Sequence, residues 1–192
     1  DFFLAFGKES KAKNFGIPES KLINIGFAFI PFGNNTIKNN TINNQDILIV
    51  SSPNITNKLF SLLAKLAAKA ENINFVVRLH PQEELKKEQI DILEKFKNIS
   101  LDDGSIDSFV SLLNYNKIIG DKSSVLYEAL ALNKVVGRLN FENFINKPTD
   151  DGFFYINSYD ELIEFILVDK LIKNNKIITY SGFKQDVVNK LL

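Results

Sequence analysis

The chain contains no cysteine, no methionine, no tryptophan and a single histidine among its 192 residues. The absence of cysteine excludes disulfide bonds and thiolate metal sites. A single imidazole does not favour a transition metal held by the protein, so we expect no metal site. No apolar run reaches the length of about 18 residues that a membrane-spanning helix needs, and no secretory signal is present.

Basic and acidic side chains balance, with 23 Lys and Arg against 23 Asp and Glu. No overall field therefore favours binding to nucleic acid or to an anionic membrane. Only two of the cations are arginine, Arg78 and Arg138. Both follow or lie beside apolar runs that end in polar residues, where a guanidinium group suits forked recognition of phosphate or carboxylate.

From residue 46 onward, short apolar runs alternate with segments of helical spacing. The predicted strands are 47–50, 75–79, 99–101, 117–120, 135–139 and 152–156. The predicted helices are 55–70, 83–96, 106–113, 123–132, 159–168 and 183–192. Ile90, Leu93 and Phe96 are expected on the inner side of the second helix, and Ser105 as the N-cap of the third. This alternation predicts an α/β fold with a Rossmann-like, doubly wound parallel sheet.

The first 45 residues follow a different pattern. They are predicted to contain short strands at 2–6 and 22–26, a short helix or turn at 8–15 and a turn at 16–21. We expect three parts: an interdomain segment or domain end at 1–33, an Asn-rich linker at 34–45, and the Rossmann-like domain with C-terminal helices at 46–192. Because the chain begins within a predicted strand and lacks methionine, we expect it to be a piece of a longer protein.

The only histidine lies at the carboxyl end of a predicted strand, where ligands of parallel sheets bind. Arg78 and His80 are two positions apart, so they share a face of the extended chain. Pro81 then ends the strand. The His80 imidazole could donate to a phosphate oxygen or act as a general acid. The alternative is a histidine that only bonds a neighbouring loop.

A second polar segment, residues 121–124, follows the predicted strand 117–120. Two hydroxyls, Ser123 and Ser124, open a helix there, and with its free N–H groups they can form an anion site to which Lys122 adds a charge. Glu128 lies one helical turn further on, where a carboxylate can accept hydrogen bonds from ribose hydroxyls. The alternative is an ordinary helix cap beside a solvated glutamate.

Two further strand ends carry polar residues. Ser51 and Ser52 follow the first buried strand and could form a second phosphate-facing turn. Asp102, Asp103 and Gly104 could bind a divalent ion or a hydroxyl. Both segments are equally good turn sequences.

The order of these motifs resembles a known family. A strand followed by His-Pro, and later a strand followed by Gly-Asp-X-Ser-Ser and a helix, resembles the donor-binding half of GT-B transferases. The likeness is to bacterial capsule and wall-polymer enzymes, namely CDP-glycerol glycerophosphotransferases and the sialyl- and polysialyltransferases with HP and SS motifs. Residues 128–136 resemble the family's Glu-Ala-X-X-X-Gly-Lys-Pro-Val, with Asn133 and Val135 in place of its Gly and Pro. Residues 16–26 resemble the passage between the two GT-B domains.

The resemblance implies a set of roles and partners. His80 would be the catalytic residue, His80 and Ser124 would contact the donor's phosphates with Ser123 beside them, and Glu128 would bind the ribose. The donor would be CMP-, CDP- or UDP-linked, without a further cofactor. A separate N-terminal domain would bind the glycan acceptor and carry the base, so we expect this chain alone to bind rather than catalyse. A cytoplasmic location is implied, with any attachment to the inner membrane face supplied by parts outside this chain.

Two alternatives stay open at this point. Sugar-nucleotide 2-epimerases share the layout, with Asp-Ser-Gly-Gly where this chain has Asp-Lys-Ser-Ser at 121–124. A flavodoxin-like, non-catalytic binding module would use the same polar strand ends only as helix caps.

Overall fold

The computed structural model describes residues 3–5, 18, 22–24, 46–53, 55–132, 134–141 and 152–167. The chain divides into two compact units, Asp1–Asn35 with Ile177–Leu192, and Thr36–Lys176. In the first unit, β1 (Phe3–Ala5) and β2 (Leu22–Asn24) lie within the two predicted short strands, and the structure pairs them in parallel. The helix or turn predicted at 8–15, the linker at 34–45 and the helix at 183–192 lie outside the described residues.

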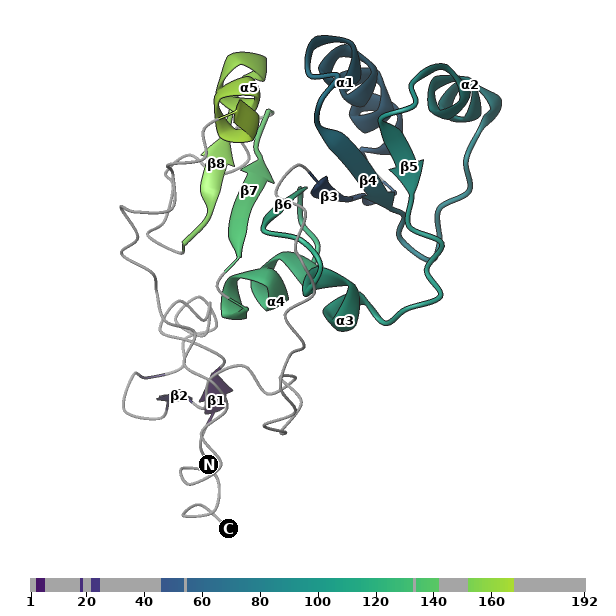
Figure 1. Ribbon diagram of the computed structural model, residues 1–192. Helices are drawn as coiled ribbons and strands as arrows, with labels where there is room; N and C mark the ends of the chain where they lie inside the picture. The colour runs from purple at the N-terminus through teal and green to yellow at the C-terminus, as the bar shows by residue number, and fades with distance from the viewer. Residues whose placement is uncertain are drawn as a thin grey trace. The chain divides into compact units, whose positions relative to one another are not determined.

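The second unit contains a six-stranded parallel sheet. Its strands are β3 (Asp46–Val50), β4 (Asn74–Arg78), β5 (Ile99–Leu101), β6 (Lys117–Gly120), β7 (Val135–Leu139) and β8 (Phe154–Ile156). Their order is β5-β4-β3-β6-β7-β8 (Figure 1). The chain thus builds outward from β3 in one direction and then in the other, which is the Rossmann strand order. The predicted fold class is confirmed.

Helices cover both faces of this sheet (Figure 1). They are α1 (Thr56–Lys69), α2 (Lys87–Lys95), α3 (Ser108–Leu112), α4 (Val125–Ala131) and α5 (Tyr159–Leu167). The first two and α5 lie on one face, and α3 and α4 lie on the other. Right-handed crossovers require this separation, because the sheet grows in opposite directions from β3. No helix in the described ranges is long and apolar enough to cross a bilayer.

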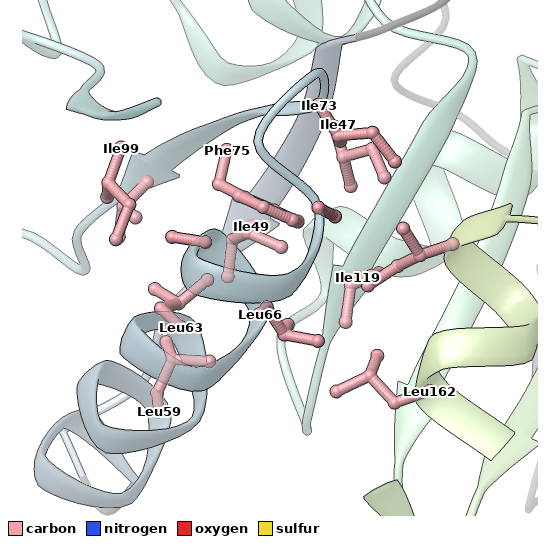
Figure 2. Packing of buried hydrophobic residues seen from close by; sticks show 14 of the residues in the cluster. Ile47, Ile49, Leu59, Leu63, Leu66, Ile73, Phe75, Ile99, Ile119 and Leu162 are labelled. Carbon is pink, nitrogen blue, oxygen red and sulfur yellow. The ribbon is translucent and has the colours of Figure 1, made fainter. Parts of the chain in front are cut away.

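Apolar side chains alternate along the central strands and supply both faces of the sheet. Ile47 and Ile49 of β3 belong to the main cluster, which Figure 2 shows packed against Leu59, Leu63 and Leu66 of α1. Leu48 of β3 points to the opposite face and is also fully buried. A strand buried on both sides must be apolar throughout, which explains why β3 has a continuous apolar run.

The second helix begins later than predicted. It starts at Lys87 instead of Glu83, because residues 80–83 form a turn in which the Glu83 N–H donates to the His80 carbonyl at 2.8 Å. The predicted N-cap of α3 was also wrong. Asp107, not Ser105, precedes that helix, and its carboxylate accepts from the Phe109 N–H at 2.9 Å.

The prediction for the inner side of α2 is confirmed for Leu93 and Phe96, which pack against the core, and is wrong for Ile90. Ile90 is 42% exposed, whereas Gln89 is buried. The Gln89 amide accepts from the Lys86 N–H and donates to the Asn57 side chain of α1, both at 2.5 Å. A polar side chain with both groups satisfied can therefore occupy the contact between α1 and α2.

Gly120 permits the close approach of α4 to the end of β6. A Cβ at this position would lie 3.0 Å from the Val50 carbonyl oxygen and 3.0 Å from Leu126 Cδ2. We expect Gly120→Ala to lower the free energy of unfolding in urea by about 1–3 kcal/mol, since overpacking forces its neighbours apart. The control is Ala68→Ser, which enlarges an exposed side chain of α1. It should change the free energy of unfolding by about 0.5 kcal/mol or less. Equal losses in the two variants would contradict the packing argument.

Candidate functional site

Three loops follow β3, β4 and β6 at one edge of the sheet. Val50 pairs with both Arg78 and Gly120, so these three strands end at the same level. The order of strands reverses between β3 and β6, which is where open α/β sheets bind ligands. The loop residues 51–52, 79–83 and 121–124 are called the rim below.

A carboxylate joins two of these loops. Glu83 Oε1 accepts a hydrogen bond from Ser51 Oγ at 2.7 Å and another from the Thr56 hydroxyl, while Glu83 Oε2 accepts from the His80 N–H at 2.5 Å. Sequence reasoning missed Glu83, because it was assigned to the start of a helix. The available signal was its spacing, since a glutamate three residues after an N–H can reach back to it as in a capping box.

His80 presents its imidazole to solvent. Its Nδ1 accepts a hydrogen bond from the Gln82 N–H at 3.2 Å. An acceptor at Nδ1 places the proton of the neutral ring on Nε2. The exposed ring therefore offers Nε2–H as a donor at the rim.

The two serines after β3 differ in what they can still bind. Ser51 is 2% exposed, and its hydroxyl proton is used by Glu83. Ser52 Oγ is buried and has no hydrogen-bond partner in the part of the chain that the structure describes. An unpaired buried hydroxyl is costly, so Ser52 is the group in this loop that needs a partner.

The two serines after β6 also differ. Ser123 Oγ accepts from the N–H of Val125, the first residue of α4, at 3.3 Å, whereas the N-cap of α4 is Ser124, whose side chain makes no capping hydrogen bond. The Ser124 side chain is exposed and makes no hydrogen bond to the described residues. Lys122 is exposed beside them. The bond to the first N–H of α4 thus accounts for the Ser123 hydroxyl, and the Ser124 hydroxyl is not used within the described residues.

Both arginines bind within the protein. Arg78 donates to Asp102 at 2.9 Å and to the Ile106 carbonyl at 2.7 Å, and so fixes the loop after β5. Arg138 Nε donates to the Asp121 carbonyl at 3.1 Å and fixes the turn after β6. Each guanidinium group therefore positions a loop at the strand ends, and Arg78 has two of its donors engaged there.

The acidic turn after β5 is also satisfied internally. Asp102 accepts from the Ser111 hydroxyl at 2.9 Å and from the Gly104 N–H at 3.0 Å. Hydrogen bonds from the Ser105 side chain and backbone lower the pKa of Asp103. Across the described ranges, no group of three or more His, Cys, Asp or Glu could coordinate a metal ion. The internal hydrogen bonds of the turn therefore explain why Asp102 and Asp103 occur in this segment.

Glu128 lies in the first turn of α4 and is half-buried. Burial raises the pKa of its carboxyl, and the Asp107 carboxylate raises it further. No described residue donates a hydrogen bond to it. A half-buried carboxylate without donors is a group that a ligand's hydroxyls would satisfy.

A small hollow of about 70 Å³ lies beside the rim. It is lined by Ile55, Lys58, Leu59, Leu62, Asp121, Leu139 and Phe141. Pockets for whole ligands usually measure about 300–1,000 Å³, so this hollow alone cannot enclose a nucleotide. Within the described residues the candidate site is an open edge.

No protein-family model and no curated protein matches this sequence. Several solved structures are similar in fold. The UDP-GlcNAc 2-epimerase from Neisseria meningitidis bound to UDP-GlcNAc has a TM-score of 0.63 at 19% identity, over 99% of this chain and 60% of that protein. The UDP-GlcNAc 2-epimerase from Methanocaldococcus jannaschii in complex with UDP-GlcNAc and UDP has a TM-score of 0.59 at 16% identity, over 99% of this chain and 60% of that protein. The wall teichoic acid polymerase TagF with CDPG has a TM-score of 0.57 at 17% identity, over 97% of this chain and 52% of that protein.

These neighbours have the GT-B fold. The chain spans only 52–60% of their length. At such low identities the likeness concerns the fold alone. The predicted resemblance to GT-B proteins is confirmed at that level, and the chain has the Rossmann-like fold of a GT-B domain.

The raised pKa of Glu128 predicts a pH-dependent stability difference. Below about pH 4.5, the ordinary pKa, the carboxyl is neutral in the folded and unfolded chain and costs nothing. Above that value the carboxyl ionises in the unfolded chain before it ionises in the folded chain, because the folded pKa is raised. The folded state therefore loses stability as the pH rises through the raised pKa. We therefore expect Glu128→Gln to be more stable than wild type at pH 7 but not at pH 3.5, measured by urea denaturation. Glu94→Gln, an exposed control on α2, should show no such difference. A less stable Glu128→Gln at pH 7 would contradict the burial argument.

Proposed function

We propose that this chain is the donor-binding domain of a GT-B transferase and that the rim binds a nucleotide-activated donor. One observation carries the proposal. At the switch point of the sheet, β3, β4 and β6 end level with one another. The segments that follow them carry an exposed imidazole donor, two serine hydroxyls without a partner in the described residues, and a half-buried carboxylate. The fold neighbours support it, since the two epimerases contain UDP-GlcNAc and TagF was determined with CDPG.

The phosphates of the donor would bind to the hydroxyl and imidazole groups of the rim. Ser124 and Ser52 have hydroxyls to donate, His80 offers Nε2–H, and Lys122 adds a positive charge. In a transfer reaction these donors would stabilise the negative charge that grows on the departing nucleotide phosphate. His80 would be able to supply a proton to it.

The ribose would bind to Glu128. Its carboxylate has no donor among the described residues and can accept from two adjacent hydroxyls. Glu128 follows Ser124 by four residues on α4, so the two side chains lie on the same face of the helix. A ligand with phosphate next to ribose fits this order of groups.

The rest of the reaction would involve parts beyond this chain. We propose a glycosyl or glycerophosphate group as the transferred group, as in sialyltransferase-like and glycerophosphotransferase-like enzymes of bacterial surface polysaccharides. A separate domain would supply the acceptor site and the base. The donor itself would be the only small molecule required.

An epimerase is the second candidate, because epimerases are among the structures similar in fold. Product analysis of the longer protein separates the two activities. An epimerase converts its sugar nucleotide without any acceptor, whereas a transferase needs one.

We expect CMP, CDP or UDP to perturb the NMR signals of the single imidazole. The test is a titration of the intact chain with each nucleotide, in which only His80 can give histidine signals. Perturbation that saturates at or below millimolar concentration supports donor binding. Unchanged signals with all three nucleotides up to several millimolar would favour the non-catalytic module.

The two serines of the β6–α4 turn should separate binding from stability. Ser124→Ala removes an exposed hydroxyl and is expected to weaken nucleotide binding by about 10-fold, the effect of one hydrogen bond to a charged group, with no change in unfolding. Ser123→Ala removes the acceptor of the Val125 N–H and should lower the free energy of unfolding by about 1 kcal/mol, the contribution of one hydrogen bond. Calorimetry and urea denaturation measure the two effects. Wild-type affinity in Ser124→Ala would exclude Ser124 from the site.

A further inference from the structure

We propose that Glu83 is the positioning residue of the rim, whose carboxylate fixes the His80 turn and the Ser51–Ser52 loop in the arrangement that binds phosphate. The inference rests on the proposed function for the nature of the ligand. The interactions that carry it lie within the protein and do not depend on any ligand.

The Glu83 carboxylate connects segments that are distant in the sequence. Its donors are the hydroxyls of Ser51 and Thr56, from the loop after β3 and the first turn of α1, and the N–H of His80. Each oxygen accepts at least one hydrogen bond. An ionised carboxylate only accepts, so three converging donors match its chemistry and are charge-assisted.

The same residue determines the conformation of the histidine. The His80 N–H donates to the Glu83 side chain and the His80 carbonyl accepts from the Glu83 N–H at 2.8 Å, so the turn is closed at both groups. Within this turn the Gln82 N–H reaches His80 Nδ1. A loosened turn would release that nitrogen, and the proton would no longer be confined to Nε2.

Glu83 also decides which serine can bind a ligand. Ser51 has one hydroxyl proton, and it is donated to Glu83, so Ser51 cannot donate to phosphate at the same time. Ser52 keeps its proton and has no partner in the described part of the chain. The carboxylate therefore selects Ser52 as the donor of this loop.

The sign of a charge-removing substitution tests the proposal. A carboxylate near a phosphate site repels the ligand, so if Glu83 were only a nearby anion, Glu83→Gln would tighten binding. If Glu83 positions the rim, the same change weakens binding. A glutamine has one acceptor oxygen, and its NH₂ group faces either the His80 N–H or the two hydroxyls, so one set of donors loses its acceptor.

The experiment compares Glu83→Gln with Glu84→Gln in the intact chain, with UDP and CDP as probes. Glu84 is an exposed neighbour, and its substitution removes the same charge from the same loop. We expect about a 10-fold loss of affinity in Glu83→Gln, and unchanged or slightly tighter binding in Glu84→Gln. Unchanged or tighter binding in Glu83→Gln would overturn the proposal.

A second readout does not need a ligand. The ¹⁵N shifts of the single imidazole, recorded above neutral pH, report which ring nitrogen carries the proton. We expect the Nε2–H form in the wild type and in Glu84→Gln, and a mixture of both forms in Glu83→Gln. The same tautomer in all three proteins, together with wild-type affinity in Glu83→Gln, would contradict the role of Glu83, because a glutamine whose oxygen keeps the His80 N–H bond loses only the bonds from the two hydroxyls. If the wild type binds no nucleotide but Glu83→Gln shifts the tautomer, the proposed function fails while the positioning role stands.

A milder variant covers the case in which Glu83→Gln does not fold. Ser51→Ala removes one donor and leaves the carboxylate and the His80 N–H bond in place. We expect a smaller loss of affinity, about threefold, with the tautomer unchanged. An affinity equal to that of the wild type would show that the link between the two loops does not affect binding.

Discussion

The pairing of β3 with β4 on one edge and β6 on the other is the constraint on which the candidate site depends. Val50 lies opposite both Arg78 and Gly120, so three loops leave the sheet at one level. Burial on both faces requires β3 to be apolar up to its last residue. Polar side chains of this part of the chain therefore begin only after Val50, in the loop that leaves β3.

The polar groups at this edge fall into two sets. Arg78, Arg138, Ser51 and Asp102 are satisfied by other groups of the protein, and they fix the loops. The hydroxyls of Ser52 and Ser124 have no hydrogen-bond partner among the described residues, and the half-buried Glu128 carboxyl accepts no hydrogen bond from them. The buried Ser52 hydroxyl and the half-buried Glu128 carboxyl lower the stability of the folded chain as long as they have no partner, whereas the exposed Ser124 hydroxyl is hydrated. The first set holds the second in place.

The parallel sheet could be predicted because its signals are local. The bounds of β5, β6 and β7 agree with their predicted ranges, since each is an apolar run closed by polar residues. The start of α2 and the burial of Gln89 could not be predicted. Both depend on side-chain hydrogen bonds, one within the His80 turn and one from α2 to α1, which compete with hydrophobic spacing. Spacing alone carries no information about such bonds.

The sequence by itself determined the fold class, the strand ends and the residue types placed there, because alternation and burial act along the chain. It also placed His80, Ser123 and Ser124 after the ends of predicted strands, and Glu128 one helical turn after Ser124. Only the tertiary structure decided which of these polar groups bond to other groups of the protein and which do not. It assigned Ser51 to Glu83, Ser123 to the Val125 N–H and both arginines to loops of the protein. A hydrogen-bond donor serves the acceptor that folding brings within about 3 Å, and that choice depends on distances in space that no local pattern contains.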